Sequence, residues 1–261
     1  MKKFNISRHF AQIAPVYRHV RTLDPEPILA IRDILVQHKK LKKPIKIADI
    51  GAGTGRYTEL LIKILKPENI NAALLIDVSF EMLSMAQSYL AGRKAYFINS
   101  PAENLPLKSQ TIEVLTAFNA IHHFDFKKFI REAQRVLKPG GFLFIYTRTQ
   151  EQNRRSIWGK FFPNFSDKEY RLFWKDDLIK RLKRLKKFEL VSYTEFEYPR
   201  ISTMEELLKK VFAKHYSTFY LYDDEEYKQA VKLFKQNLLK YYDPEQITYT
   251  DENTLIALKK N

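Results

Sequence analysis

The sequence contains no cysteine, and only 7 of its 261 residues are glycine. The absence of cysteine excludes disulfide bonds and thiolate metal sites. No stretch approaches the ~18 consecutive apolar residues that a membrane-spanning helix needs. Residues 1–5 lead into polar and charged positions instead of the apolar core of a signal peptide. We therefore expect a cytoplasmic protein with no transmembrane segment, while peripheral contact with a membrane stays open.

Positive charge is abundant, with 45 lysines and arginines against 30 acidic residues and a net charge of +15. Such an excess attracts nucleic acid or an anionic membrane surface. It is also typical of lysine-rich proteomes such as those of many thermophiles. The basic residues are spread along the whole chain, so we favour the second interpretation and keep nucleic acid as a less favoured partner.

Three of the seven glycines lie within five positions, in the segment Asp-Ile-Gly-Ala-Gly-Thr-Gly at 49–55. Average usage would place roughly 18 glycines along the whole chain. The segment follows an apolar run at 45–50 that predicts a strand. Glycine allows a tight turn and close approach of a ligand, which indicates a nucleotide-type cofactor. The dinucleotide fingerprint is Gly-x-Gly-x-x-Gly, but here Arg56 occupies the last position, which disfavours NAD and FAD.

Predicted strands and helices alternate after residue 44. Strands are expected at 45–50, 72–77, 95–98, 111–118 and 142–147, and helices at 56–65, 80–90 and 126–137. Beyond residue 150 we expect a strand at 188–197, helices at 203–215 and 224–241, and a last strand at 246–258. This order predicts an α/β fold with a doubly wound parallel sheet.

We expect three regions along the chain. Residues 1–44 would be helical and close over the cofactor site, residues 45–148 would form the cofactor-binding core, and residues 149–261 would hold a helical cap and the last two strands on the substrate side. The cap would be inserted before the last strand.

Asp77 ends the second predicted strand. A carboxylate at this position can accept both hydrogen bonds of a ribose diol. The alternative is that Asp77 caps the helix that follows, and the nearby glycine turn favours ribose binding.

Four features together resemble the class I S-adenosylmethionine-dependent methyltransferases, of the type that includes the ubiquinone/menaquinone-biosynthesis methyltransferases. They are the turn at 49–55, Asp77, the segment Ala-Glu-Asn-Leu-Pro-Leu at 102–107, and Arg-Val-Leu-Lys-Pro-Gly-Gly at 135–141. The resemblance covers residues 10–148. It implies a Rossmann-like, seven-stranded, mostly parallel sheet with an antiparallel last strand.

The resemblance also implies S-adenosylmethionine as cofactor and a set of binding residues. Gly51, Ala52 and Gly53 would line its amino-acid end, and Asp77 would hold the ribose. The remaining predicted cofactor residues are Val78, Met82, Ala102 and Glu103 around the adenine, Asn119 at the methionine portion and Tyr17 over the sulfonium. Many members of the family have aspartate before this alanine, whereas this chain has Pro101. Adenine recognition must then use backbone or a neighbouring side chain.

His122 and His123 follow the fourth predicted strand, where cofactor and substrate meet in the family. Either histidine can act as a general base. The alternative is that one packs and the other caps the helix beginning at Asp125. Arg148 can reach an anionic substrate or be solvated.

Six aromatic residues beyond residue 160 have two interpretations. They can line an apolar substrate pocket or form the core of the cap. They are Phe161, Phe162, Phe165, Tyr170, Phe173 and Trp174.

The sequence thus predicts a methyltransferase that acts directly on a small or lipophilic molecule without a metal ion. The alternatives are an RNA methyltransferase, which the positive charge supports, and a cofactor-binding protein without turnover. The oligomeric state stays open.

Overall fold

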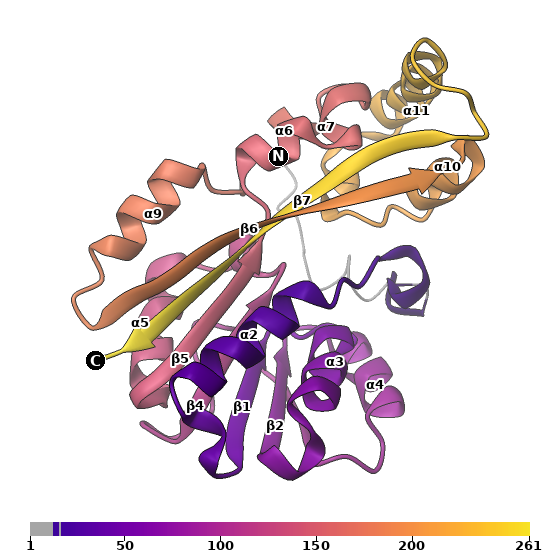
Figure 1. The fold of residues 1–261 in the computed structure, drawn as a ribbon. Helices are drawn as coiled ribbons and strands as arrows, with labels where there is room; N and C mark the ends of the chain where they lie inside the picture. Colours follow the sequence, from indigo (N-terminus) through magenta and orange to yellow (C-terminus); the bar gives the residue numbers. More distant parts are fainter. Residues whose placement is uncertain (1–12, 16) are drawn as a thin grey trace.

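A computed structural model describes residues 13–15 and 17–261 (Figure 1). In this part of the chain, seven strands form one sheet in the order β3-β2-β1-β4-β5-β7-β6. The strands are β1 (Ile45–Ile50), β2 (Ile70–Asp77), β3 (Ala95–Asn99), β4 (Ile112–Phe118), β5 (Leu137–Thr147), β6 (Phe188–Ser202) and β7 (Ile247–Lys260). The pairs among β1 to β5 are parallel, and β7 is antiparallel to both β5 and β6. The predicted fold class is confirmed, including the antiparallel last strand.

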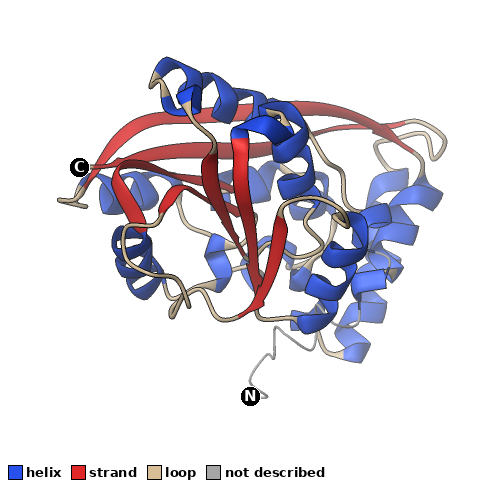
Figure 2. Ribbon diagram, turned by 90° about the horizontal axis from the view of Figure 1, so that it is seen from below, coloured by secondary structure: helices blue, strands red, loops and turns tan. Residues whose placement is uncertain are grey.

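Helices cover both faces of the sheet, as Figure 2 shows. Apolar side chains of α2 (Glu26–Gln37), α3 (Arg56–Leu65) and α4 (Phe80–Tyr89) pack on one face. Those of α5 (Phe126–Val136) and α9 (Lys175–Lys183) pack on the other. Because both faces are buried, the central strands are continuously apolar, which is why runs of apolar residues located them well.

The strands β6 and β7 extend past the rest of the sheet and carry the cap at their far end (Figure 1). β6 continues to Ser202, beyond the predicted end at residue 197. Pro199 is tolerated within it because β6 is an edge strand and needs hydrogen-bond partners on one side only.

The cap has an apolar core of its own. It joins α7 (Ile157–Phe161), α10 (Met204–Phe212) and α11 (Asp224–Leu239). Trp158 and Phe234 stack at its centre, with ring centroids 5.3 Å apart. Three other short helices complete this region: α6 (Gln150–Arg155), α8 (Phe165–Lys168) and the 3-10 helix η4 (Ser217–Leu221). These helices precede the last strand, as predicted.

The prediction that residues 1–44 are helical is wrong in part. Residues 17–20 and α2 are helical, but residues 21–25 between them are not. Pro25 disfavours helical geometry at the residue before it. α2 ends at Gln37, ahead of the basic run, and Lys39 has a left-handed φ of 56°. Residues 1–12 and 16 lie outside the described residues, and the three-region division stays a prediction.

No helix in residues 13–15 and 17–261 combines the length and the apolar character that crossing a bilayer requires.

Candidate functional site

The glycine turn lies at the carboxyl end of β1, and each of its glycines has a left-handed φ. At Gly51, with φ +69°, an added Cβ would stand 2.5 Å from the Cβ of Ala120. At Gly53, with φ +54°, an added Cβ would meet nothing within 4 Å. Gly51 therefore allows close packing against the segment after β4, whereas Gly53 faces open space.

Asp77 stands beside this turn at the end of β2. Its Oδ2 accepts the backbone N–H of Gly53 at 2.8 Å, and its Oδ1 accepts that of Ser79 at 2.9 Å. Burial raises the pKa of Asp77, and these two N–H donors oppose the rise. Ser79, not Asp77, caps α4 by accepting the N–H of Met82, so the capping alternative for Asp77 is wrong. A carboxylate has about four acceptor sites, which leaves Asp77 able to bind further donors.

A cavity of about 200 Å³ opens in front of the turn and Asp77. We call it the cofactor cavity. Nine of the ten predicted cofactor residues line it: Tyr17, Gly51, Gly53, Asp77, Val78, Met82, Ala102, Glu103 and Asn119. Ala52 is the exception, because its side chain packs against the apolar cluster on the α2–α4 face.

Other residues that no sequence motif indicated also line the cofactor cavity. Ser100 directly follows β3, and Phe118 is the last residue of β4. Their positions at the ends of predicted strands could have identified them. The carboxyl ends of parallel strands meet at one edge of a sheet, where ligands bind. Ser100 and Glu103 are the polar neighbours available in place of the absent aspartate at position 101.

The N-terminal segment contributes Tyr17 to the lining of this cavity. Ile13 packs against Met82 of α4. Arg18 donates to Oε2 of Glu59 at 2.8 Å and to the carbonyl oxygen of Thr54 at 3.0 Å, which fastens the segment to the start of α3. These contacts bring Tyr17 to the rim.

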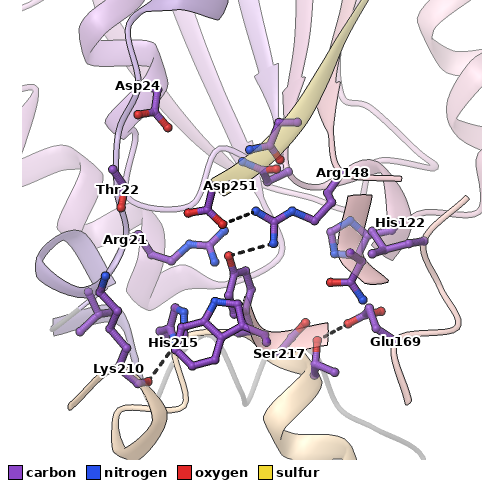
Figure 3. A pocket seen from close by; sticks show the side chains of 18 of the residues that line it. Arg21, Thr22, Asp24, His122, Arg148, Glu169, Lys210, His215, Ser217 and Asp251 are labelled. Carbon is purple, nitrogen blue, oxygen red and sulfur yellow. Dashed lines mark hydrogen bonds and ion pairs between the residues drawn. The ribbon is translucent and has the colours of Figure 1, made fainter. Parts of the chain in front are cut away.

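A second cavity, of about 100 Å³, adjoins the first (Figure 3). We call it the inner cavity. Tyr17, Asn119 and His123 line both cavities. The charged residues that line the inner cavity are Arg21, Asp24, Arg148, Glu169, Arg200, Lys210 and Asp251. It is therefore polar, and it is built from segments far apart in the sequence.

Arg148 lies buried just after the end of β5, so the alternative that it is solvated is wrong. Its Nη2 donates to Oδ1 of Asp251 at 2.9 Å, and its Nε donates to the carbonyl oxygen of Glu252 at 3.0 Å. Its Nη1 donates to the hydroxyl of Tyr216 at 3.4 Å. These bonds connect β5, β7 and the cap.

The two histidines belong to the 3-10 helix η3 (Ile121–His123), with ring centroids 4.0 Å apart. The cap of α5 is Asp125, which accepts the N–H of Lys128, so the capping alternative for a histidine is wrong. Burial lowers the pKa of His122 to about 4. The buried Nδ1 of His122 has no hydrogen-bond partner among the described residues. At pH 7 this imidazole is neutral and can accept a proton or a hydrogen bond.

The six aromatic residues predicted near the substrate line neither of these two cavities in the described part of the chain. Phe162 and Phe165 are buried in the core of the cap, whereas Tyr170 and Trp174 are 74% and 42% exposed. These two cavities therefore do not support the apolar-pocket alternative, although Phe161 lines a third cavity beside Tyr249. The aromatic residue of the cap's first helices that does line the inner cavity is Trp158.

Comparison with known proteins shows that this chain is similar to methyltransferases. A family model described as a methyltransferase domain matches residues 48–145. The ubiquinone/menaquinone biosynthesis C-methyltransferase UbiE of Campylobacter jejuni is 34% identical over 163 residues, which span 58% of this chain and 66% of that relative. The chain thus spans just under two thirds of the length of that protein.

Solved structures share the fold. A candidate methyltransferase from an antibiotic biosynthesis pathway of Anabaena variabilis has a TM-score of 0.62 at 20% identity, covering 87% of this chain and 96% of that one. The geranyl diphosphate C-methyltransferase of Streptomyces coelicolor, solved with S-adenosyl-L-homocysteine, has a TM-score of 0.52 at 11% identity, covering 89% and 76%. The chain therefore matches a methyltransferase-domain model over residues 48–145 and is similar to methyltransferases in sequence and in fold.

Proposed function

We propose that this protein transfers a methyl group from S-adenosylmethionine to a small molecule held in the inner cavity. The observation that carries the proposal is the junction of two cavities at Tyr17, Asn119 and His123. A cavity over the glycine turn leads there into a smaller, polar one. The relative from Campylobacter is named for methylating carbon in quinone biosynthesis, and the polar lining of the inner cavity fits a small acceptor that carries polar groups.

The residues of the cofactor cavity fit S-adenosylmethionine. The open space in front of Gly53 leaves room for a ligand against the turn. Asp77 offers a buried carboxylate already fixed by two N–H donors, suited to a ribose diol. Val78 and Met82 present apolar surface on the same wall, which suits adenine. When bound, the cofactor supplies an electrophilic methyl group on a sulfonium.

The chain's own contribution is positioning and exclusion of water. Tyr17 and Asn119 stand where the two cavities meet and would orient the acceptor. His122 and His123 remain our candidates for a base. A pKa of about 4 makes His122 a weak base, so it would act on an acceptor that releases its proton easily.

The RNA alternative is less well supported. Arg21 of the N-terminal segment and Lys210 of the cap both line the inner cavity. A polynucleotide would have to displace one of them to place a base there. The remaining alternative, cofactor binding without turnover, predicts the same cofactor cavity and is separated by a turnover assay.

Calorimetric titration with S-adenosylmethionine and S-adenosylhomocysteine tests the proposal. Asp77→Ala removes two charge-assisted hydrogen bonds and should weaken binding about 100-fold. Asp33→Ala, at a carboxylate 66% exposed in α2, is the matched control and should bind normally. Absence of binding by the wild type, or equal binding by Asp77→Ala, would overturn the assignment. Tight gel-shift binding of tRNA at physiological salt would favour the RNA alternative instead.

A further inference from the structure

The ion pairs of the inner cavity leave part of its positive charge unmatched. Arg200 places Nη2 2.7 Å from both oxygens of Asp24. Asp251 is occupied by Arg148. Glu169 is paired with Arg171, which lies outside the lining, and accepts the hydroxyl of Thr218.

Each acidic residue of the lining is thus matched, and two cations of the lining are not. Among the described residues, no carboxylate lies within ion-pair distance of Arg21 or of Lys210.

Arg21 is held by aromatic rings. Its guanidinium carbon lies 4.4 Å from the ring centroid of Tyr216 and 5.9 Å from that of Tyr17. Stacking uses the faces of the guanidinium and leaves its in-plane N–H donors available for a planar acid group. Arg21 belongs to the non-helical residues 21–25 of the N-terminal segment, and its side chain lines the cavity (Figure 3).

Lys210 enters the same cavity from α10. Burial lowers the pKa of Lys210. The carboxylates of Asp251 and Glu206 raise this pKa, and the positive charges of Arg200 and Arg21 lower it further. Arg21, Arg200 and Lys210 line the same cavity, so their positive charges repel one another. An anion between them would relieve this repulsion.

Two histidines of the lining, His122 and His215, add no positive charge at neutral pH. Burial lowers the pKa of His215 well below its usual value, and the nearby Arg21, Lys210 and Arg148 lower it further. His215 Nδ1 donates to the carbonyl oxygen of Lys210 at 2.8 Å, which helps to fix the end of α10. Arg21 and Lys210 are therefore the arginine and lysine of the lining whose charges no carboxylate among the described residues matches.

We propose that Arg21 and Lys210 bind an acid group of the methyl acceptor, a carboxylate or a phosphate, in the inner cavity. The inference rests on the proposed function for the identity of the bound molecule as acceptor. The acid group would lie on the side of Tyr216 and α10, and the atom to be methylated would face the junction lined by Tyr17, Asn119 and His123. The protein would select small organic acids over neutral molecules of the same shape.

Calorimetric titration of the full chain with benzoate, phenyl phosphate and the uncharged benzamide tests this selection. Titrations are run with and without saturating S-adenosylhomocysteine. We expect one anion to bind at least about tenfold more tightly than benzamide, since each charge-assisted bond contributes about a factor of ten. The anion that binds more tightly identifies the acid group as carboxylate or phosphate.

The double variant Arg21→Gln/Lys210→Gln should lose the preference for the anion and still bind S-adenosylhomocysteine. Lys209→Gln, at the adjacent exposed lysine of α10, is the matched control and should behave as the wild type. Arg21→Lys keeps the charge but loses the planar N–H donors, so it should bind the anion more weakly than the wild type and more tightly than Arg21→Gln.

Equal binding of anions and benzamide, or an unchanged preference in the double variant, would overturn the proposal. Failure of the wild type to bind S-adenosylhomocysteine would instead count against the proposed function, because the titrations without it still measure the anion site.

Discussion

The cofactor cavity and the inner cavity adjoin each other but are built in different ways. Apart from Tyr17, the cofactor cavity is lined by residues 51–124, most of them at or just after the ends of β1, β2, β3 and β4. The inner cavity draws its residues from positions 17 to 253. The first is a product of local strand–turn–helix geometry, and the second exists only when the N-terminal segment, β5, β6, β7 and the cap meet.

The forces that hold the two cavities differ as well. Backbone turns and N–H donors shape the cofactor cavity. The free-energy cost of forming it is mostly the conformational entropy lost by the backbone. Buried ion pairs shape the inner cavity, and each charge that loses its partner there becomes expensive. This contrast predicts that changes in the cap should disturb the substrate side and spare the cofactor side.

The largest effect is expected from Trp158→Ala, which empties the centre of the cap core. The side chain is 2% exposed and stacks on Phe234, so we expect a loss of about 3–5 kcal/mol of stability. Cofactor binding should persist, because Trp158 does not line the cofactor cavity within the described chain. Chemical denaturation and calorimetry measure the two quantities.

Trp174→Ala is the matched control for this change, because Trp174 is 42% exposed. It should lower stability by less than about 1 kcal/mol. If Trp158→Ala abolished S-adenosylhomocysteine binding while the sheet stayed folded, the separation of the two sides would be refuted.

The next largest effect is expected from Asp251→Ala. This change leaves the buried Arg148 without its carboxylate partner, at side-chain exposures of 9% and 15% for the pair. We expect a loss of about 3 kcal/mol, measured by urea unfolding. The exposed pair of Glu205 and Lys209 offers the control, since Glu205→Ala should cost less than about 1 kcal/mol. Equal losses at the two sites would argue against a buried ion-pair network.

A smaller effect, dependent on pH, is expected at Asp49 in β1. Burial raises the pKa of this carboxyl to about 7; hydrogen bonds from Thr58 and Thr116 oppose the rise, and the charge of Asp77 adds to it. The folded protein then holds a proton that the unfolded chain releases near pH 4, so stability falls as pH rises from about 4 to 7.

Asp49→Asn should remove this dependence. Between pH 5 and pH 8 the wild type should lose about 2–3 kcal/mol more than the variant, measured by urea unfolding without cofactor. Asp33→Asn, at an exposed carboxylate, should follow the wild type. Parallel pH profiles for wild type and Asp49→Asn would show that Asp49 does not titrate in this range.

The smallest change in stability, about 1 kcal/mol, is expected for Gly53→Ala, where only the left-handed φ is strained. Its added methyl group would stand in open space at the cofactor cavity, so affinity for S-adenosylhomocysteine should fall more than stability does. Gly51→Ala should show the reverse order, because its methyl group would collide with Ala120. Thermal unfolding and calorimetry together distinguish the two; the same ranking for both variants would contradict the geometry.

Sequence alone determined the fold class and most of the cofactor cavity. The strands were visible because burial on both faces makes them apolar, and the turn at 49–55 was visible because glycine is scarce elsewhere. Nine of the ten predicted cofactor residues meet in one cavity because strand ends bring them to one edge of the sheet. Their roles in binding stay predictions until the titrations are done.

Only the tertiary structure decided the inner cavity. No local pattern separates Lys210 from the other basic residues of a chain with charge +15, and none shows which of Arg21, Arg148 and Lys210 lack a carboxylate partner. Asp24, Glu169 and Asp251 determine which cations are paired. The packing of the cap, and not the spacing in sequence, sets the distance between each carboxylate and its cation. The role of a charged residue can be inferred only when its burial and its partner are known, because both determine the free energy of the charge.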